Sequence, residues 1–516
     1  MMGDLRIRRW VWRVLVVLTL CLGFGAWAGA PAGLAQQDDD STWSEPIQLS
    51  DVGQSSWFPH MVVDRSGRVH IVYATGLLLQ TGGFDQVMYT SSDDGVTWSA
   101  PNDIAALSMG PNGESEVARP NLFLDRSDVL HMTYRGLGTF SIFYSQVPIA
   151  AAGLARSWSV RQEVGDVGYF SQVGVDRRGT VHVIYTSNIV SRQCPICYHI
   201  FYRASSDNGA TWSEPVDISR VNTGSAKPQL LIDADGNIHV AWESARGGTL
   251  GRVEQPAQLL YTSSLDGGAT WREPVLIQMP ESEGSLRTAL TVDPQGRLMI
   301  ISSAVPGNEI FASLSSDHGQ TWSLPAQVAD LKGSPVSALD NLAVATDGAG
   351  RVHLVCNCAP EVREGVYNLT HVVWDGTNWS EPEIIRQYRG DLPEWPVIGV
   401  GLGNQLHVAW FVRNEAAIFN SDRGQYTIWY SGRTIDAPSV TPIAEPTLPP
   451  SATPPAVAQI LTATPRPTAT QVFISGQVDP TRQYTEQDYV MLVAISMAPV
   501  LLIVAGIVVY QRVIRR

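Results

Sequence analysis

The sequence is poor in positive charge, and in lysine above all. Only two lysines, Lys227 and Lys332, occur among 35 basic residues, against 49 acidic ones. Once the four arginines and Asp4 of residues 1–35 and the three arginines of residues 512–516 are set aside, 28 basic and 48 acidic residues leave a net charge of −20. A chain this acidic repels a polyanion, so nucleic acid is not expected as a partner. The acidic balance suits the solubility of an exported domain.

Cysteine is scarce as well. Four of the five cysteines remain after Cys21, which lies in a segment that we expect to be removed, and they form two close pairs. In an exported chain we expect Cys194 and Cys197 to form a local disulfide, with a redox site or a zinc ligand set as the alternatives. The pairing of Cys356 and Cys358 stays open, because a bridge between residues i and i+2 of a strand would be strained.

One eight-residue pattern occurs four times. It reads Ser-x-Asp-x-Gly-x-Thr-Trp and covers residues 91–98, 205–212, 264–271 and 315–322. Recurrence at spacings of tens of residues indicates one supersecondary unit copied around a larger architecture. Strand-like residues flank the copies, so we interpret each as a hairpin turn in which the Ser and Asp side chains bond local N–H groups. The structural aspartates of these turns are Asp93, Asp207, Asp266 and Asp317.

A second repeated element precedes these turns. It is an apolar strand, a turn of the form Asp-x-x-Gly, and a second apolar strand that carries a histidine. It occurs around Asp64, Asp125, Asp176, Asp233 and Asp347, and two degenerate copies around Asp293 and Gly401 have lost the His and the Asp respectively. Each unit therefore has four short strands: A before Asp-x-x-Gly, B with the histidine, C before the eight-residue turn, and D after it.

Seven such units predict an all-β fold, a seven-bladed β-propeller of four-stranded antiparallel blades over residues 36–437. The seventh unit lacks its strand D, which would leave an open sheet edge. The segment Ser-Thr-Trp-Ser-Glu-Pro at residues 41–46 matches strand D. We therefore expect the N-terminal strand to complete the last blade and close the ring.

The eight-residue turns resemble the Asp-box, or BNR repeat, of sialidases and related β-propellers, and the resemblance covers most of residues 41–436. It implies three arginines that bind the substrate carboxylate, a Tyr nucleophile paired with a Glu, and an Asp acid. The Phe/Tyr-Arg-Ile-Pro motif of the first arginine is missing, and its nearest match is Ala118-Arg119-Pro120. Tyr388 and Glu394 are the candidates for the catalytic pair. The predicted seven blades depart from the six of sialidases.

Both ends of the chain predict a surface protein. Residues 1–35 have a basic start and an apolar run, which is typical of a signal peptide, with an N-terminal membrane anchor as the alternative. Residues 438–488 are rich in Pro and Thr and predict an extended stalk. Residues 489–511 predict a transmembrane helix, and the arginines of residues 512–516 place the tail in the cytoplasm. We expect a single-pass protein of the cell membrane with the propeller outside.

The strand order places a candidate site at the centre of one face. The Asp-x-x-Gly turns and the boxes share one face of the ring, while the long, variable B–C and D–A connections share the other. The residue six positions before each repeat Asp starts strand A on this variable face, near the axis; we call these the ring positions. They hold Phe58, Arg119, Phe170, Lys227, Arg287, Asn341 and Trp395, flanked by Trp57, Asp340 and Glu394.

Cations beside aromatic rings suit an anionic, partly apolar ligand such as an acidic sugar, because Arg pairs bidentately with a carboxylate and stacks on ring faces. Of the three cations, Lys227 would bind a carboxylate with less geometric precision than Arg119 or Arg287. The alternative is that these side chains are wedged between blades and only cap strand A.

Two functions follow from this reading. The first is a module that binds a glycan or a protein at the variable-loop face, and the alternative is an exo-glycosidase of sialidase type that hydrolyses terminal acidic sugars. No cofactor is expected. Six of the ten histidines share one strand-B position, which separates neighbours by about 10 Å, so we expect no metal site among them. Calcium at the Asp-x-x-Gly turns is a minor alternative.

Overall fold

A computed structural model of the chain describes residues 43–51, 54–76, 85–107, 117–136, 141–189, 197–245, 257–280, 284–335, 340–414 and 426–443. The predicted signal peptide, the predicted transmembrane helix and most of the predicted stalk lie outside these residues. Over the described ranges, the chain contains no helix with the length and apolar character that crossing a membrane requires.

The described residues form antiparallel β-sheets, with two single-turn 3-10 helices, η1 (Ile149–Ala151) and η2 (Ala155–Ser157). Five sheets have four strands and a sixth has eight. The four-stranded sheets are, from the inner to the outer strand, β2 (Ser55–Val63), β3 (Val69–Gly76), β4 (Asp85–Ser92) and β5 (Asn102–Leu107); β6 (Val117–Leu124), β7 (Val129–Gly136), β8 (Ser141–Pro148) and β9 (Gln162–Gly165); β10 (Gly168–Val175), β11 (Val181–Ile189), β12 (Cys197–Ser205) and β13 (Val216–Asp217); β14 (Gly224–Ile232), β15 (Ile238–Ala245), β16 (Gln258–Ser264) and β17 (Val275–Ile277); and β26 (Leu392–Gly401), β27 (Gln405–Arg413), β28 (Tyr426–Thr434) and β1 (Ile47–Gln48). The eight-stranded sheet contains β18 (Gly284–Val292), β19 (Leu298–Val305), β20 (Glu309–Ser315), β21 (Ala326–Gly333), β22 (Ala343–Thr346), β23 (Val352–Ala359), β24 (Val366–Trp374) and β25 (Glu383–Arg389).

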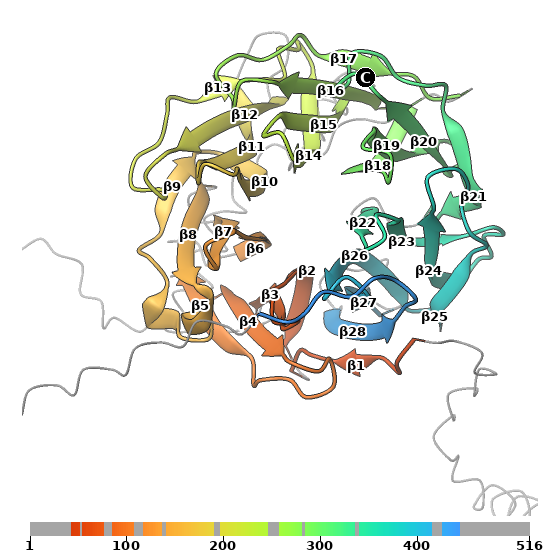
Figure 1. The fold of residues 1–516 in the computed structure, drawn as a ribbon, viewed down its shortest axis with the longest axis horizontal. Helices are drawn as coiled ribbons and strands as arrows, with labels where there is room; N and C mark the ends of the chain where they lie inside the picture. The colour runs from red at the N-terminus through yellow and green to blue at the C-terminus, as the bar shows by residue number, and fades with distance from the viewer. Residues whose placement is uncertain are drawn as a thin grey trace, which may run out of the picture. The chain divides into compact units, whose positions relative to one another are not determined.

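The sheets surround a common centre (Figure 1). The inner strands β2, β6, β10, β14, β18, β22 and β26 contact one another in this order, and β26 contacts β2. The eight-stranded sheet arises because the end of β21 pairs with β23, at Lys332 opposite Ala359. Antiparallel sheets arranged radially in chain order define a β-propeller. The all-β propeller predicted from the repeats is therefore confirmed.

The N-terminal strand β1 lies on the outer edge of the last sheet. Ile47 pairs with Tyr430 and Gln48 with Trp429 of β28, and the backbone N–H of Leu49 donates to the Ile428 carbonyl at 2.8 Å. The segment expected to supply the missing strand D thus occupies that position. Residues 438–443, which we expected to begin the stalk, continue along the sheets, and the N–H of Ile443 donates to the Arg65 carbonyl.

A hydrogen-bonded Asp-His-Tyr chain recurs between sheets. Asp233 Oδ2 lies 3.2 Å from His239 Nε2, and His239 Nδ1 lies 2.7 Å from the Tyr261 hydroxyl. Tyr261 donates to the carbonyl of His318 in the box of the next sheet and packs edge-on against Trp322. The strand-B histidine lies beside the Tyr hydroxyl of strand C in four further sheets. Buried polar groups need such partners, and the predicted packing and hydrogen-bonding role of these histidines is confirmed.

The histidine in the last sheet predicts acid sensitivity. His407 bonds the Tyr430 hydroxyl but has no Asp partner at the preceding turn, where Gly401 stands, and burial lowers its pKa to about 4. The unfolded chain, with a His pKa of about 6.5, binds more protons than the folded one between these values, so unfolding free energy falls as pH falls through this window. We expect His407→Gln to lose about 2 kcal/mol less stability than the wild type between about pH 7 and about pH 5. Urea unfolding at both pH values measures this, and equal losses in the two proteins would contradict it.

The boxes are closed by their own side chains. In the second box, Ser205 Oγ donates to Asp207 Oδ1 and accepts from the Gly209 N–H, and Asp207 accepts from the Thr211 N–H and hydroxyl. These hydrogen bonds lower the pKa of Asp207 to about 2. Asp266 and Asp317 make the same contacts in their boxes.

In the first box, the structural aspartate lies one residue after the predicted Asp93. Here Asp94, and not Asp93, accepts from the N–H groups of Val96 and Thr97, while the exposed Asp93 pairs with Arg68 at 3.2 Å. The turn is one residue shorter, because the Gly95 N–H donates to the hydroxyl of Ser92, three positions earlier, where the other boxes use four. The eight-residue pattern fits Ser91 and Asp93, whereas Ser92 and Asp94 form the hydrogen bonds of the turn.

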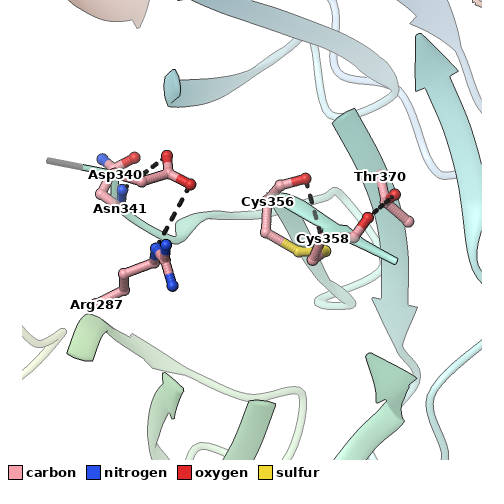
Figure 2. The surroundings of a disulfide bond; sticks show 6 residues. All are labelled: Arg287, Asp340, Asn341, Cys356, Cys358 and Thr370. Carbon is pink, nitrogen blue, oxygen red and sulfur yellow. Dashed lines mark hydrogen bonds and ion pairs between the residues drawn. A yellow bond between two sulfur atoms is a disulfide. The ribbon is translucent and has the colours of Figure 1, made fainter. Parts of the chain in front are cut away.

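A disulfide joins Cys356 and Cys358 within β23 (Figure 2). Their Cα atoms are 5.3 Å apart, closer than the roughly 6.6 Å between residues i and i+2 of a regular strand, so β23 is contracted here. The pairing that the sequence left open is thereby settled. Cys197 is disulfide-bonded, and its predicted partner Cys194 lies outside the described residues.

Candidate functional site

Most inner strands carry a bulge at the ring position. The pairing with the neighbouring strand shifts register there in β2, β6, β10, β14, β18 and β26. In five sheets the residue at the ring position has a left-handed backbone, with φ between 48° and 60°: Phe58, Arg119, Lys227, Arg287 and Trp395. This conformation costs a non-glycine residue about 1–2 kcal/mol. Backbone strain that recurs at one structural position suggests a function for that position.

The ring positions surround a cavity of about 300 Å³. Seven of the nine predicted ligand-binding residues line it: Arg119, Phe170, Lys227, Arg287, Asp340, Asn341 and Trp395. The other two, Phe58 and Trp57, are not among its lining residues and make contacts in the core. The Phe58 ring packs edge-on against Trp395 and Phe411, with centroids 5.0 and 5.6 Å apart, and the Trp57 ring packs against Tyr426.

Arg119 is held by aromatic rings and by no acid. Its guanidinium carbon lies 4.3 Å from the ring centroid of Phe58, 4.2 Å from that of Tyr169 and 4.8 Å from that of Phe170. The residue is 6% exposed, and its Nε has no hydrogen-bond partner. In the described part of the chain it forms no ion pair. A desolvated guanidinium without a counter-charge is costly, so Arg119 is poised to bind an anion.

Lys227 forms a buried ion pair with Glu243. The Lys227 Nζ and Glu243 Oε1 atoms are 3.4 Å apart. Burial lowers the pKa of Lys227, and the Glu243 carboxylate opposes this shift. The same carboxylate accepts a hydrogen bond from the Arg287 N–H at 2.8 Å. Glu243 therefore compensates the charge of Lys227 and fixes the backbone of Arg287.

Arg287 faces Asp340, which lies just before the next inner strand β22 (Figure 2). Arg287 Nε lies 3.5 Å from Asp340 Oδ2, and the Asp340 carboxylate accepts from the N–H groups of Asn341 and Trp395. Burial raises the pKa of Asp340, and the Arg287 charge opposes this shift. Arg287 also donates to the Ser334 carbonyl. Asp340 therefore positions one cation and two neighbouring ring positions.

Polar side chains link the inner strands below the ring positions. The Asn121 amide and His60 Nε2 are 2.9 Å apart, and Asn121 Oδ1 accepts from the Val173 N–H. The side-chain Oε1 of Gln172 likewise accepts from the Leu230 N–H at 2.6 Å. Burial lowers the pKa of His60 to about 4. These contacts form the wall of the cavity and fix the spacing of the ring positions.

The predicted catalytic pair does not meet at this cavity. Tyr388 lies on β25, the outer strand of its sheet, and its hydroxyl accepts from the Trp410 indole N–H at 2.8 Å. Glu394 starts an inner strand, but its buried carboxylate pairs with Arg413 at 2.6 Å. Neither residue lines the cavity. The structure therefore does not bring the two predicted residues together at the cavity, because Tyr388 lies on the outer strand of its sheet and Glu394 on an inner strand.

Two residues of the site were not predicted from the sequence. Tyr169 precedes the ring residue Phe170 and stacks on Arg119, and an aromatic pair at a ring position was its only signal. Glu243 comes from the end of strand β15, not from the start of an inner strand. Strand B ends differently in each sheet, so no repeated position marked it.

This fold and this site define a class of protein: an all-β propeller with cationic and aromatic side chains around a central cavity. The BNR repeat-like domain model matches residues 166–431, more than half of the chain. The chain belongs to the BNR repeat-like domain family, which confirms the resemblance stated from the Asp-boxes. No curated protein sequence matches the chain.

Several solved structures are similar to the chain at low sequence identity. A polysaccharide lyase acting as an ulvan lyase is 11% identical with a TM-score of 0.49, covering 74% of this chain and 95% of that one. The intramolecular trans-sialidase from Ruminococcus gnavus, in complex with oseltamivir carboxylate, is 13% identical with a TM-score of 0.43, covering 77% and 98%. A mutant NanB sialidase from Streptococcus pneumoniae is 14% identical with a TM-score of 0.43, covering 76% and 71%. The family assignment rests on the domain match and the strand order.

Proposed function

We propose that this chain is a binding protein for an acidic glycan, with the ligand carboxylate at Arg119 and the sugar ring against the neighbouring aromatic faces. The propeller has seven blades in this proposal, with β18–β21 and β22–β25 counted as separate blades. Residues 1–35 export it, and residues 489–511 anchor it in the cell membrane at the end of the Pro/Thr-rich stalk. A protein ligand at the same face is the other form of binding that the composition allows.

The state of Arg119 carries the proposal. Lys227 and Arg287 have acids nearby, Glu243 and Asp340, whereas Arg119 has three aromatic rings and no acid in the described chain. A carboxylate would gain a charge-assisted hydrogen bond from a guanidinium that is already desolvated. Aromatic faces beside the cation suit the apolar face of a sugar ring. This combination favours an acidic sugar over a neutral sugar or a bare inorganic anion.

A sialidase-type hydrolase is the second candidate, and the convergence of three cations on one cavity favours it. The reaction also requires a nucleophile and an acid in reach of the substrate. Asp340 is the one acid among the described lining residues, and it is engaged by Arg287. The geometry therefore supports binding better than hydrolysis.

The carboxylate dependence of binding tests the proposal. We expect the purified chain to bind a sialylated trisaccharide at least about tenfold more tightly than the same sugar with its carboxylate reduced to an alcohol, because a hydrogen bond to a charged group contributes about 1.5–3 kcal/mol. Calorimetry or surface plasmon resonance measures both affinities. Equal affinities would contradict the proposal. Release of the fluorophore from an aryl sialoside by the same preparation would favour the hydrolase.

A further inference from the structure

Three metal-ligating side chains meet on the face opposite the ring positions. Asp233 lies in the turn between β14 and β15, His239 lies on β15, and His318 lies in the box after β20 of the next sheet. One ligand atom from each lies within 4.8 Å of the others. Asp233 Oδ2 is 3.2 Å from His239 Nε2 and 3.9 Å from His318 Nδ1.

We infer that Asp233, His239 and His318 bind a divalent transition metal ion, with zinc as the ion that the donor set fits best. Zinc bonds of about 2.0–2.1 Å in tetrahedral geometry place neighbouring donor atoms about 3.3 Å apart. The two histidine nitrogens lie 3.2 and 3.9 Å from Asp233 Oδ2, and all three donor atoms lie within 4.8 Å of one another, so a small movement of His318 completes the site. Two imidazoles and one carboxylate favour zinc over calcium, which prefers oxygen ligands. The fourth position is open to water.

The surroundings prepare two of the ligands. His239 is fully buried, and its Nδ1 lies 2.7 Å from the Tyr261 hydroxyl, the outer contact that orients a metal-bound imidazole. A metal at Nε2 places the proton on Nδ1, which then donates to Tyr261, while Tyr261 donates to the His318 carbonyl at 3.3 Å. The side chain of His318 is 50% exposed, so it can adjust to the ion.

Two charges of opposite sign flank the cluster. Arg272 donates to the His318 carbonyl at 3.3 Å, and the Asp317 carboxylate belongs to the same box as His318. Among the three ligands, the Asp233 carboxylate supplies a negative charge, which suits a cation.

Other sheets have the Asp-His pair without the third ligand. The position of His318 in its box is held by Asn208 in the second box and Gly267 in the third. Among the described residues, this cluster alone brings three such side chains together. The expectation of no metal site rested on the strand-B histidines being too far apart, and His318 is not one of them. It comes from the neighbouring repeat.

Zinc titration of the purified full chain, free of any histidine tag, tests the inference. We expect one equivalent of Zn²⁺ to bind and to raise the melting temperature, and Co²⁺ to give the visible absorption of a tetrahedral site. His318→Asn should weaken Zn²⁺ binding by at least about 100-fold, since even outer contacts contribute about 10- to 100-fold. This variant should fold normally, because Asn208 occupies the equivalent position with φ 57°, against 56° at His318.

The matched control is His199→Asn. His199 Nδ1 also lies beside a carboxylate, 2.7 Å from Asp217 Oδ2, but belongs to no group of three ligands among the described residues. Its replacement should leave the Zn²⁺ affinity unchanged. A wild-type chain without saturable Zn²⁺ binding, or binding that survives in His318→Asn, would overturn the inference.

Discussion

Replacing Arg119 by methionine is expected to weaken the binding of a carboxylated sugar by about 10- to 100-fold without lowering the melting temperature. The affinity falls because the guanidinium supplies the one cation at the ring without an acid beside it among the described residues, and a charge-assisted hydrogen bond contributes about 1.5–3 kcal/mol. The stability holds because the change removes a desolvated charge and keeps the side-chain volume between three aromatic rings. The left-handed backbone costs arginine and methionine the same free energy, so it does not contribute to the difference in stability.

The control for this variant is Arg178→Met. Arg178 is exposed in an Asp-x-x-Gly turn on the opposite face, so its replacement removes the same charge from the protein without touching the cavity. Titration calorimetry and thermal unfolding of both variants give the two quantities. If Arg178→Met weakens binding as much as Arg119→Met, the effect belongs to net charge and the site is misplaced. A large drop in melting temperature for Arg119→Met would show that Arg119 serves the fold.

Gly268→Ala is expected to destabilise the propeller by about 2–5 kcal/mol. Gly268 is the box glycine of the third box, with φ at +91°, and a Cβ there would overlap the hydroxyl of Tyr202 from the preceding sheet. The left-handed backbone accounts for about 1–2 kcal/mol and the displaced ring for about 1–3 kcal/mol. Tyr202 also bonds His182 at 2.8 Å, so the whole chain of hydrogen bonds between the two sheets must shift.

Gly236→Ala separates the two contributions. Gly236 has φ at +86° in an Asp-x-x-Gly turn, and no atom lies within 4 Å of a Cβ placed there. We expect it to lose about 1–2 kcal/mol, from the backbone alone. Urea unfolding of both variants measures the difference. Equal losses would mean that the contact between the box and the Tyr of the preceding sheet contributes nothing.

The sequence predicted the architecture because repeats carry it. The Asp-x-x-Gly turns and the strand-B histidines recur in nearly every sheet, and the Trp-Ser-Glu-Pro segment marked the strand that pairs with β28. Register within a turn was harder to predict. Two serines and two aspartates adjoin at residues 91–94, and the pattern fitted one pair while the hydrogen bonds use the other.

The ring positions were predictable from strand order, but their conformation was not. Spacing from the repeat Asp identified seven residues at or just before the inner strands, and six of them line the cavity together with Asp340. The bulge that gives Arg119 its left-handed backbone leaves no mark in side-chain periodicity. Phe58 faced the core because Trp395 and Phe411 from the adjoining sheet offered it apolar contacts, which spacing along one sheet does not reveal.

Contacts between neighbouring sheets could not be predicted from the sequence. Tyr388 and Glu394 are six residues apart in sequence, yet one lies on a rim strand and the other on an inner strand. His318 and Asp233 are far apart in sequence, yet they adjoin. Each repeat determines the strands of its own sheet. The side-chain contacts between two neighbouring sheets depend on which residue the next repeat places there.

The pairing of β1 with β28 also constrains the order of events when the protein is made. Ser50 and Ile428 are hydrogen-bonded although 378 positions separate them, so the first described strand emerges from the ribosome long before its partner exists. Contacts between such distant segments form slowly, and domains begin to fold while synthesis continues. The intermediate sheets can assemble one after another, but the last sheet keeps an open edge until both ends of the propeller are present. The ring can therefore close only after β28 has been synthesised, and a chain that is interrupted before Tyr426 leaves β1 without its partner strand.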